Sequence, residues 1–151
     1  ENWQSKLGYV PQDVYVMDET LKKNIVFGIP EDQVNEKLMH EVIKKTRLET
    51  FVNSLPKKLN SNIGNVGSKI SGGQKQRIGI ARALYACPEI LILDEATNSL
   101  DIANENKILD EIFENKIDKT IIIISHRHHN LHKFDKIYKI EKGKVYLNGK
   151  T

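Results

Sequence analysis

Two adjacent carboxylates, Asp94 and Glu95, end an apolar run in the segment EILILDEATNSLD. The four residues before them, Ile90–Leu93, are typical of a buried strand, and open α/β sheets bind ligands at the carboxyl ends of their strands. Because adjacent strand residues point to opposite sides, we expect the two carboxylates to do different work. One can bind Mg²⁺, and the other can polarise a water that attacks phosphorus. The alternative is that these acids only end the strand or cap the next helix.

A second segment, ISGGQKQR, combines a helix cap with two glycines. Ser71 and Gln74 have the spacing of a capping box, which predicts a helix over 72–86. Gly72 and Gly73 leave backbone N–H groups uncovered, so an anion can approach the positive end of the helix dipole. The alternative is that the two glycines only allow tight packing.

Two further polar residues follow predicted strands. His126 comes just after the apolar run 120–124, and Gln12 comes after a short strand over 7–10 and a proline. Both are therefore expected at the edge of the sheet that carries the carboxylates. A histidine in that place can contact a phosphate, although a single histidine at a strand end is more often structural.

Composition limits the class of protein. The chain has 151 residues, a net charge of +3 and one cysteine, which excludes an internal disulfide. Its lysines are mixed with acids, so we expect a solvated surface and no nucleic-acid partner. No apolar run approaches the roughly 20 residues that cross a bilayer. Zinc is not expected at His128, His129 and His132, because no cysteine or acid cluster completes a site there.

The elements that must position these residues alternate between strand and helix. A helix over 103–115 separates the strand at 90–93 from the strand at 120–124. The strand at 120–124 is apolar on both faces, as in a sheet that is covered on both sides. A hairpin with its turn at Lys142-Gly143 ends the chain. This alternation predicts an α/β fold with a parallel sheet.

Residues 12–70 have a different pattern, which predicts a helical insertion. A Pro-Glu-Asp motif is a good helix start, and Val34, Leu38 and Val42 then recur on one helical face. A second helix is expected over 48–55, where it ends at a proline.

Taken in order, Gln12, ISGGQKQR, ILILDEATNSLD and His126 resemble the nucleotide-binding domain of an ABC transporter. The resemblance covers nearly the whole chain. It implies an α/β fold with a P-loop NTPase-like ABC ATPase core, a mostly parallel sheet with flanking helices, plus a helical subdomain. Residues 1–151 would form a partial ABC ATPase domain, with the helical subdomain at about 12–86 and the catalytic core at 87–151. The stretch YVPQDVYVMDETLKKNIVFG resembles the exporter branch.

The resemblance also implies roles for the site residues, with ATP and Mg²⁺ as cofactors. Gln12 is implied as a catalytic and metal-binding residue near the transmembrane coupling helix, Asp94 as the metal ligand and Glu95 as the catalytic base. His126 is implied to be catalytic and to contact the γ-phosphate. The implied nucleotide-binding residues of the signature and the D-loop are Ser71, Gly72, Gly73, Gln74 and Asp101.

A phosphate cradle of the form G-x-x-x-x-G-K-[ST] does not occur in these 151 residues. The segment KVYLNGKT offers Gly149-Lys150-Thr151, but Lys144 stands where the first glycine is needed. In the family that this chain resembles, the cradle precedes the glutamine, so we expect it upstream of Glu1, in an N-terminal part of the domain that is missing here. The parent protein is expected to be a transport-coupled ATPase, and the 151-residue chain alone to be inactive.

The expected partners also follow from the resemblance. Two nucleotide-binding domains, as a homodimer or a heterodimer, close over two MgATP, so that Ser71 of one domain covers the nucleotide of the other. A transmembrane domain fused upstream would place the chain at the cytoplasmic face of a membrane. Two alternatives stay open: a soluble ABC-type ATPase that acts on ribosomes or DNA, and a non-hydrolysing interaction cassette.

Overall fold

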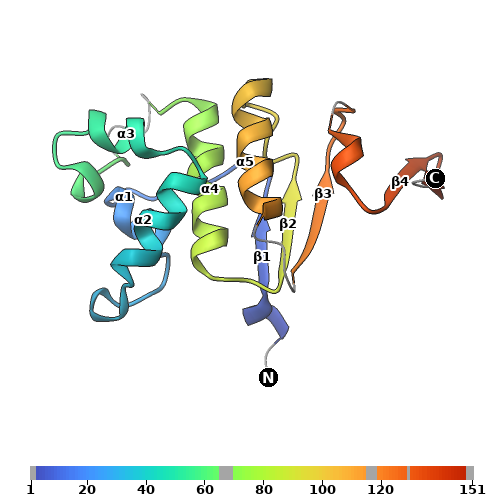
Figure 1. Ribbon diagram of the computed structural model, residues 1–151. Coiled ribbons are helices and arrows are strands. Elements are labelled where there is room, and N and C mark those ends of the chain that lie inside the picture. Colours follow the sequence, from blue (N-terminus) through green and yellow to red (C-terminus); the bar gives the residue numbers. More distant parts are fainter. Residues whose placement is uncertain (1–2, 65–69, 115–118, 129, 149–151) are drawn as a thin grey trace.

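Three parallel strands form the centre of the molecule (Figure 1). The computed structural model describes residues 3–64, 70–114, 119–128 and 130–148. The strands are β1 (Leu7–Val10), β2 (Ile90–Asp94) and β3 (Thr120–Ile124), with β2 in the middle. The expected parallel sheet is therefore confirmed, and each strand lies within one residue of its predicted bounds.

Helices α4 (Gly72–Tyr85) and α5 (Ile102–Glu114) pack on the same face of this sheet (Figure 1). Both helices were predicted, and their starts agree to within one residue; residue 115, the predicted end of the second, lies outside the described residues. The contact buries alternate strand residues against one side of each helix, as period-2 and period-3.6 patterns require. The buried cluster contains Val10, Ile80, Leu91, Leu93, Ile108, Leu109 and Ile112.

The other face of the sheet is open, which corrects the expectation that β3 is covered on both sides. Tyr9, Ile122 and Ile124 are 52%, 45% and 49% exposed. The registers Tyr9↔Ile92 and Ile92↔Ile122 place these side chains in rows on one face. The reason is that α4, in the connection between β1 and β2, and α5, in the connection between β2 and β3, both lie on the opposite face. Among the described residues, no helix covers this side.

A helical part lies beside the sheet, as the pattern of residues 12–70 predicted (Figure 1). It contains α1 (Leu21–Ile25), α2 (Glu36–Lys45), α3 (Glu49–Ser54) and 3-10 turns at Glu31–Gln33 and Lys58–Asn60. Two further 3-10 turns outside this part cover Trp3–Lys6 and Leu131–Lys133. None of the described helices is long and apolar enough to cross a membrane.

Helix α4 joins the helical part to the sheet. Its residues Ile78, Ala81 and Tyr85 belong to the core of the helical part, whereas Ile80 and Ala83 belong to the cluster against the sheet. Gly79 allows the close approach, because a Cβ there would lie 2.6 Å from a methyl group of Val14. The two hydrophobic cores therefore share one helix.

The start of α2 corrects a predicted boundary. The Pro-Glu-Asp motif forms only a 3-10 turn, and the α-helix begins at Glu36. The side chain of Asn35 accepts a hydrogen bond from the backbone N–H of Leu38, so this residue is the N-cap. Val34 therefore precedes the helix, although it still packs against the same core.

The chain ends in a hairpin of β4 (Ile137–Glu141) and β5 (Lys144–Asn148), as predicted. Lys142 and Gly143 have φ values of 49° and 73°, the left-handed conformation that a tight two-residue hairpin turn requires.

The start of α5 is held by an acidic cap. The carboxylate of Asp101 accepts hydrogen bonds from the backbone N–H of Asn104 at 2.9 Å and from the side-chain amide of Asn104 at 2.6 Å. These bonds favour the charged form and hold the pKa of Asp101 below its usual value.

A buried ion pair joins α5 to the segment after β3. Arg127 Nη1 lies 2.5 Å from Glu105 Oε2, and the Glu105 side chain is only 4% exposed. The same guanidinium donates to the backbone carbonyls of Asn98 and Leu100. Thr97 donates to the other oxygen of Glu105 at 2.8 Å. The loop between β2 and α5 is thus tied to the end of β3.

The cap predicts an acid-dependent loss of stability. Because the pKa of Asp101 is lowered in the folded state, its contribution is present above about pH 4 and is lost as the pH falls below that value. Asp101→Asn keeps a capping side chain but does not titrate. When the pH is lowered from about 5 to about 3, the melting temperature of the variant is therefore expected to fall by less than that of the parent. Parallel curves of melting temperature against pH would contradict this.

Two ion pairs hold acidic residues of α5, and we expect loss of the cation to be costly for the buried pair and cheap for the exposed one. Arg127→Met removes the guanidinium that pairs with the buried Glu105 carboxylate, and we expect the free energy of unfolding to fall by about 3 kcal/mol. Lys133→Met removes a pair with the half-exposed Asp110 on the same helix, and should cost about 1 kcal/mol or less. Denaturant titration measures both losses, and equal losses would show that burial of Glu105 is unimportant.

Candidate functional site

The two predicted carboxylates lie at the carboxyl end of β2, but only one of them belongs to the strand. Asp94 is the last strand residue and is half-buried on the open face. Glu95 follows it with φ 50°, a left-handed conformation that is uncommon for residues other than glycine. The two side chains are separated by this turn, and not by strand alternation alone as the sequence suggested.

His126 directly contacts Glu95. Its Nε2 atom lies 2.8 Å from Glu95 Oε1, and the His126 side chain is 85% exposed while that of Glu95 is 18% exposed. Asn98 donates to the other carboxylate oxygen at 2.8 Å. The parallel pairing of β2 with β3 explains the meeting, since the N–H of Glu95 donates to the carbonyl of Ile124, two residues before His126.

Asp94 has a partner that the sequence analysis missed. The hydroxyl of Tyr9 donates to Asp94 Oδ2 at 3.0 Å, and this bond to a carboxylate raises the pKa of Tyr9. The signal was available in the alternation of β1, because Tyr9 lies on the same face as Asp94. The carboxylates therefore have separate contacts, Asp94 with Tyr9 and Glu95 with His126.

Two other predicted residues do not join this cluster. Gln12 lies two residues after the end of β1, at the correct edge, and is exposed. No hydrogen bond links Gln12 to either carboxylate in the described part of the chain. Asp101 instead bonds to Asn104 as the cap of α5.

The signature segment, Ser71–Gln74, forms the start of α4. The predicted capping box is confirmed: Ser71 Oγ accepts from the N–H of Gln74 at 3.2 Å, and Gln74 Oε1 accepts from the N–H of Ser71 at 2.9 Å. Ser71 and Gly72 are exposed. Within the described residues, the N–H groups of Gly72 and Gly73 have no hydrogen-bond partner, as is usual at a helix start.

The glycines also have the packing role that the sequence left open. A Cβ at Gly72 would lie 3.1 Å from Ser99 Oγ, and one at Gly73 would lie 3.1 Å from the Ser99 carbonyl oxygen. The start of α4 therefore rests on the loop that follows Glu95. Binding of an anion by these residues stays a prediction.

Gln76 and Arg127 are further residues that sequence reasoning did not single out. Both reach the loop after β2: Gln76 bonds to its backbone from α4, and Arg127 does so from the segment after β3. Local sequence contains no signal for these contacts, because each joins residues that are 19 or more positions apart.

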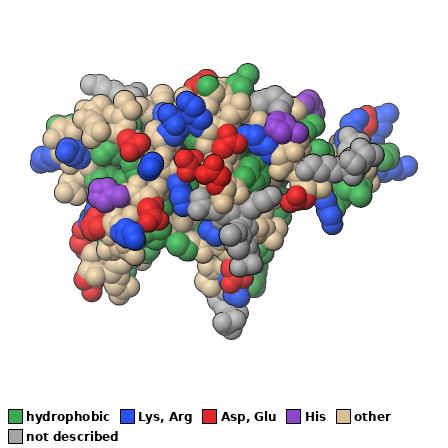
Figure 2. Space-filling model, in the orientation of Figure 1, with side chains coloured by type: hydrophobic (Ala, Val, Ile, Leu, Met, Phe, Trp, Pro, Cys, Tyr) green, Lys and Arg blue, Asp and Glu red, His purple; other side chains and the backbone are tan. Residues whose placement is uncertain are grey.

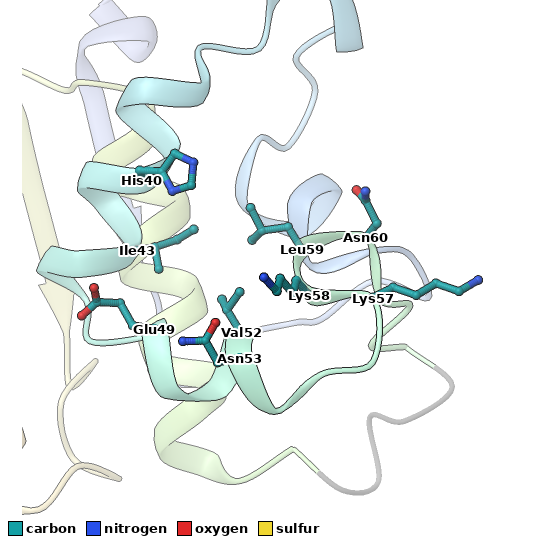
Figure 3. A pocket seen from close by; sticks show the side chains of 9 residues that line it. All are labelled: His40, Ile43, Glu49, Val52, Asn53, Lys57, Lys58, Leu59 and Asn60. Atoms are coloured by element: carbon teal, nitrogen blue, oxygen red, sulfur yellow. The ribbon is translucent and has the colours of Figure 1, made fainter.

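Other surfaces are less informative. A pocket of about 410 Å³ lies in the helical part, between α2, α3 and the turn at Lys58–Asn60, and contains no predicted site residue (Figure 3). Figure 2 shows Lys and Arg mixed with Asp and Glu over the face in view. In the described ranges, no three His, Cys, Asp or Glu residues gather as metal ligands; His129 and Gly149–Thr151 lie outside those ranges.

Comparison with known proteins gives a consistent result. The sequence model of the family described as ABC transporter matches residues 1–98. A "Multidrug resistance ABC transporter ATP-binding and permease protein" of Lactococcus lactis subsp. lactis (strain IL1403) is 42% identical over 99% of this chain and 25% of its own length. A protein of the same description from L. lactis subsp. cremoris (strain MG1363) is 40% identical over 99% of the chain and 25% of its own length.

A solved structure agrees in fold. "Structure of a bacterial Atm1-family ABC exporter with ATP bound" superposes with a TM-score of 0.84 at 34% identity, and the match covers 93% of this chain and 24% of that one. The chain thus spans about a quarter of the length of these relatives. Its parallel sheet with flanking helices is that of the ABC ATPase core, and the chain belongs to the ABC transporter family.

Proposed function

We propose that this chain is part of the ATP-binding and ATP-hydrolysing domain of an ABC exporter, and that it works at the cytoplasmic face of a membrane. The observation that carries the proposal is the contact of Glu95 with His126, at the carboxyl edge of a parallel sheet and next to Asp94. The exporter relatives favour this function over a ribosome- or DNA-acting ATPase and over a non-hydrolysing cassette.

Asp94 is the proposed ligand of Mg²⁺. Mg²⁺ is usually bound by one or two carboxylates together with substrate phosphates, so a cage of protein ligands is not needed. A half-buried carboxylate at the sheet edge fits that requirement. The ion would neutralise charge on the phosphates of ATP. The hydroxyl of Tyr9 holds one oxygen of Asp94 and so fixes the orientation of the carboxylate.

Glu95 is the proposed general base. Its carboxylate is held from both sides, by His126 on one oxygen and Asn98 on the other, and can accept the proton of an attacking water. The exposed imidazole of His126 can stabilise charge on the transferred phosphoryl group. Gln12, exposed after β1, is proposed to act near Mg²⁺ and the transmembrane coupling helix.

The signature segment is proposed to bind the nucleotide of a second domain. Ser71 and the N–H groups of Gly72 and Gly73 lie at the positive end of a 14-residue helix, which is suited to a phosphate. Gln74 holds Ser71 in place through the capping box. Asp101 caps the start of α5 and is proposed to take part in binding nucleotide from there.

The open face of the sheet is the proposed contact with the rest of the ATP-binding domain. Tyr9, Ile122 and Ile124 would be covered there by the element that carries the phosphate cradle.

The proposed division of the chain places the helical subdomain at about residues 12–86 and the catalytic core at residues 87–151. Helix α4 nevertheless contributes to both hydrophobic cores.

Glu95→Gln in the complete transporter tests the proposed base. We expect ATP turnover, measured as phosphate release, to fall by about 100-fold or more, while ATP binding persists. Glu89→Gln is the matched control, because Glu89 precedes the opposite end of the same strand and its side chain pairs with Lys6 at the surface. Unchanged turnover in Glu95→Gln would remove Glu95 as the base.

The 151-residue chain tests the need for the phosphate cradle. Purified by itself, it should release no phosphate from MgATP, because no G-x-x-x-x-G-K-[ST] segment is present to hold the nucleotide. Phosphate release above that of a Glu95→Gln version of the same chain would contradict this.

A further inference from the structure

The side chain of Gln76 is buried, and both its amide oxygen and its amide nitrogen bond to the loop after β2. It lies on α4, five residues after Ser71, and is 4% exposed. Its Oε1 accepts from the N–H of Ser99 at 2.8 Å, and its Nε2 donates to the carbonyl of Glu95 at 3.3 Å. Because a buried amide without partners is costly, these bonds determine where the loop can lie.

The loop to which Gln76 bonds begins with a residue in a left-handed backbone conformation. Glu95 has φ 50°, a conformation that persists only when the surroundings hold it. Its N–H is held by β3, through the carbonyl of Ile124, and its carbonyl is held by Asn98 N–H and by Gln76. The direction of the Glu95 carboxylate therefore depends in part on α4.

The start of α4 also packs against the loop after β2. Gly72 and Gly73 approach Ser99 so closely that a Cβ on either would lie 3.1 Å from a Ser99 atom. The signature segment thus packs directly against Ser99. Gln76, on the same helix, forms a second connection, because it bonds to the backbone of both Ser99 and Glu95. A displacement of α4 would move Gln76 and, through its hydrogen bond, the carbonyl of Glu95.

We propose that Gln76 is a positioning residue that couples the signature segment of this chain to the orientation of Glu95 in the same chain. The inference rests on the proposed function, in which Ser71 contacts a partner's nucleotide and Glu95 acts on the chain's own. Gln76 then links the two nucleotide sites through one subunit. It touches neither nucleotide, and acts through the backbone of Glu95.

The test uses the complete transporter with Gln76→Met, which keeps the volume of the side chain but neither hydrogen bond. We expect kcat for ATP hydrolysis to fall by about 10- to 100-fold, while KM stays within about twofold. Gln76→Glu, which keeps the acceptor for Ser99 but loses the donor to Glu95, should also lower kcat and is the second variant if the first folds poorly. Gln33→Met, at an exposed glutamine in a 3-10 turn, is the control and should match the parent.

A double-mutant cycle separates positioning from packing. In a Glu95→Gln background, Gln76→Met should reduce the residual rate no further, because it acts through Glu95. Multiplicative losses, or a raised KM with unchanged kcat, would overturn the inference. If Glu95→Gln itself leaves turnover intact, the proposed function fails; if it abolishes turnover while both Gln76 variants keep the parent kcat, only the role of Gln76 fails.

Discussion

The left-handed turn at Glu95 is the constraint on which the candidate site depends. A strand that continued straight would carry the second carboxylate away from the end of β3. With φ 50°, the chain instead turns so that Glu95 reaches His126 and Asn98 while its N–H still bonds to β3. Such a backbone costs on the order of 1–3 kcal/mol, which the surrounding contacts must offset. These contacts come from α4, from the loop itself and from the neighbouring strand.

Two side chains hold the rest of that loop from opposite sides. Gln76 bonds to it from α4, and Arg127 bonds to two of its carbonyls from the segment after β3 while it pairs with the buried Glu105. Ala96 and Leu100 of the loop belong to the core against the sheet, and its other residues are polar or charged. Its shape is therefore decided largely by directional bonds, whose geometry is narrower than that of hydrophobic packing. This suits a loop that must present Glu95 in one orientation.

Patterns that are local in sequence predicted most of the fold. The apolar runs of β2 and β3, the capping box at Ser71 and the turn at Lys142-Gly143 each depend on neighbouring residues, and all were confirmed. The start of α2 was missed because Asn35 competes as a cap with the earlier proline and acids. The open face of β3 was missed because a uniformly apolar strand does not tell which side its helices cover.

The candidate site, like the fold, has features that local sequence predicts and features that depend on tertiary contacts. The amino-acid sequence by itself determined the residue types, their order and the strand ends at which they occur, because these follow from side-chain chemistry and from short-range periodicity. Only the tertiary structure decided that Glu95 meets His126, that Tyr9 bonds to Asp94 and that Gln76 and Arg127 hold the loop. Each of these contacts joins residues far apart in the chain, so it exists only after the strands have paired and the helices have packed.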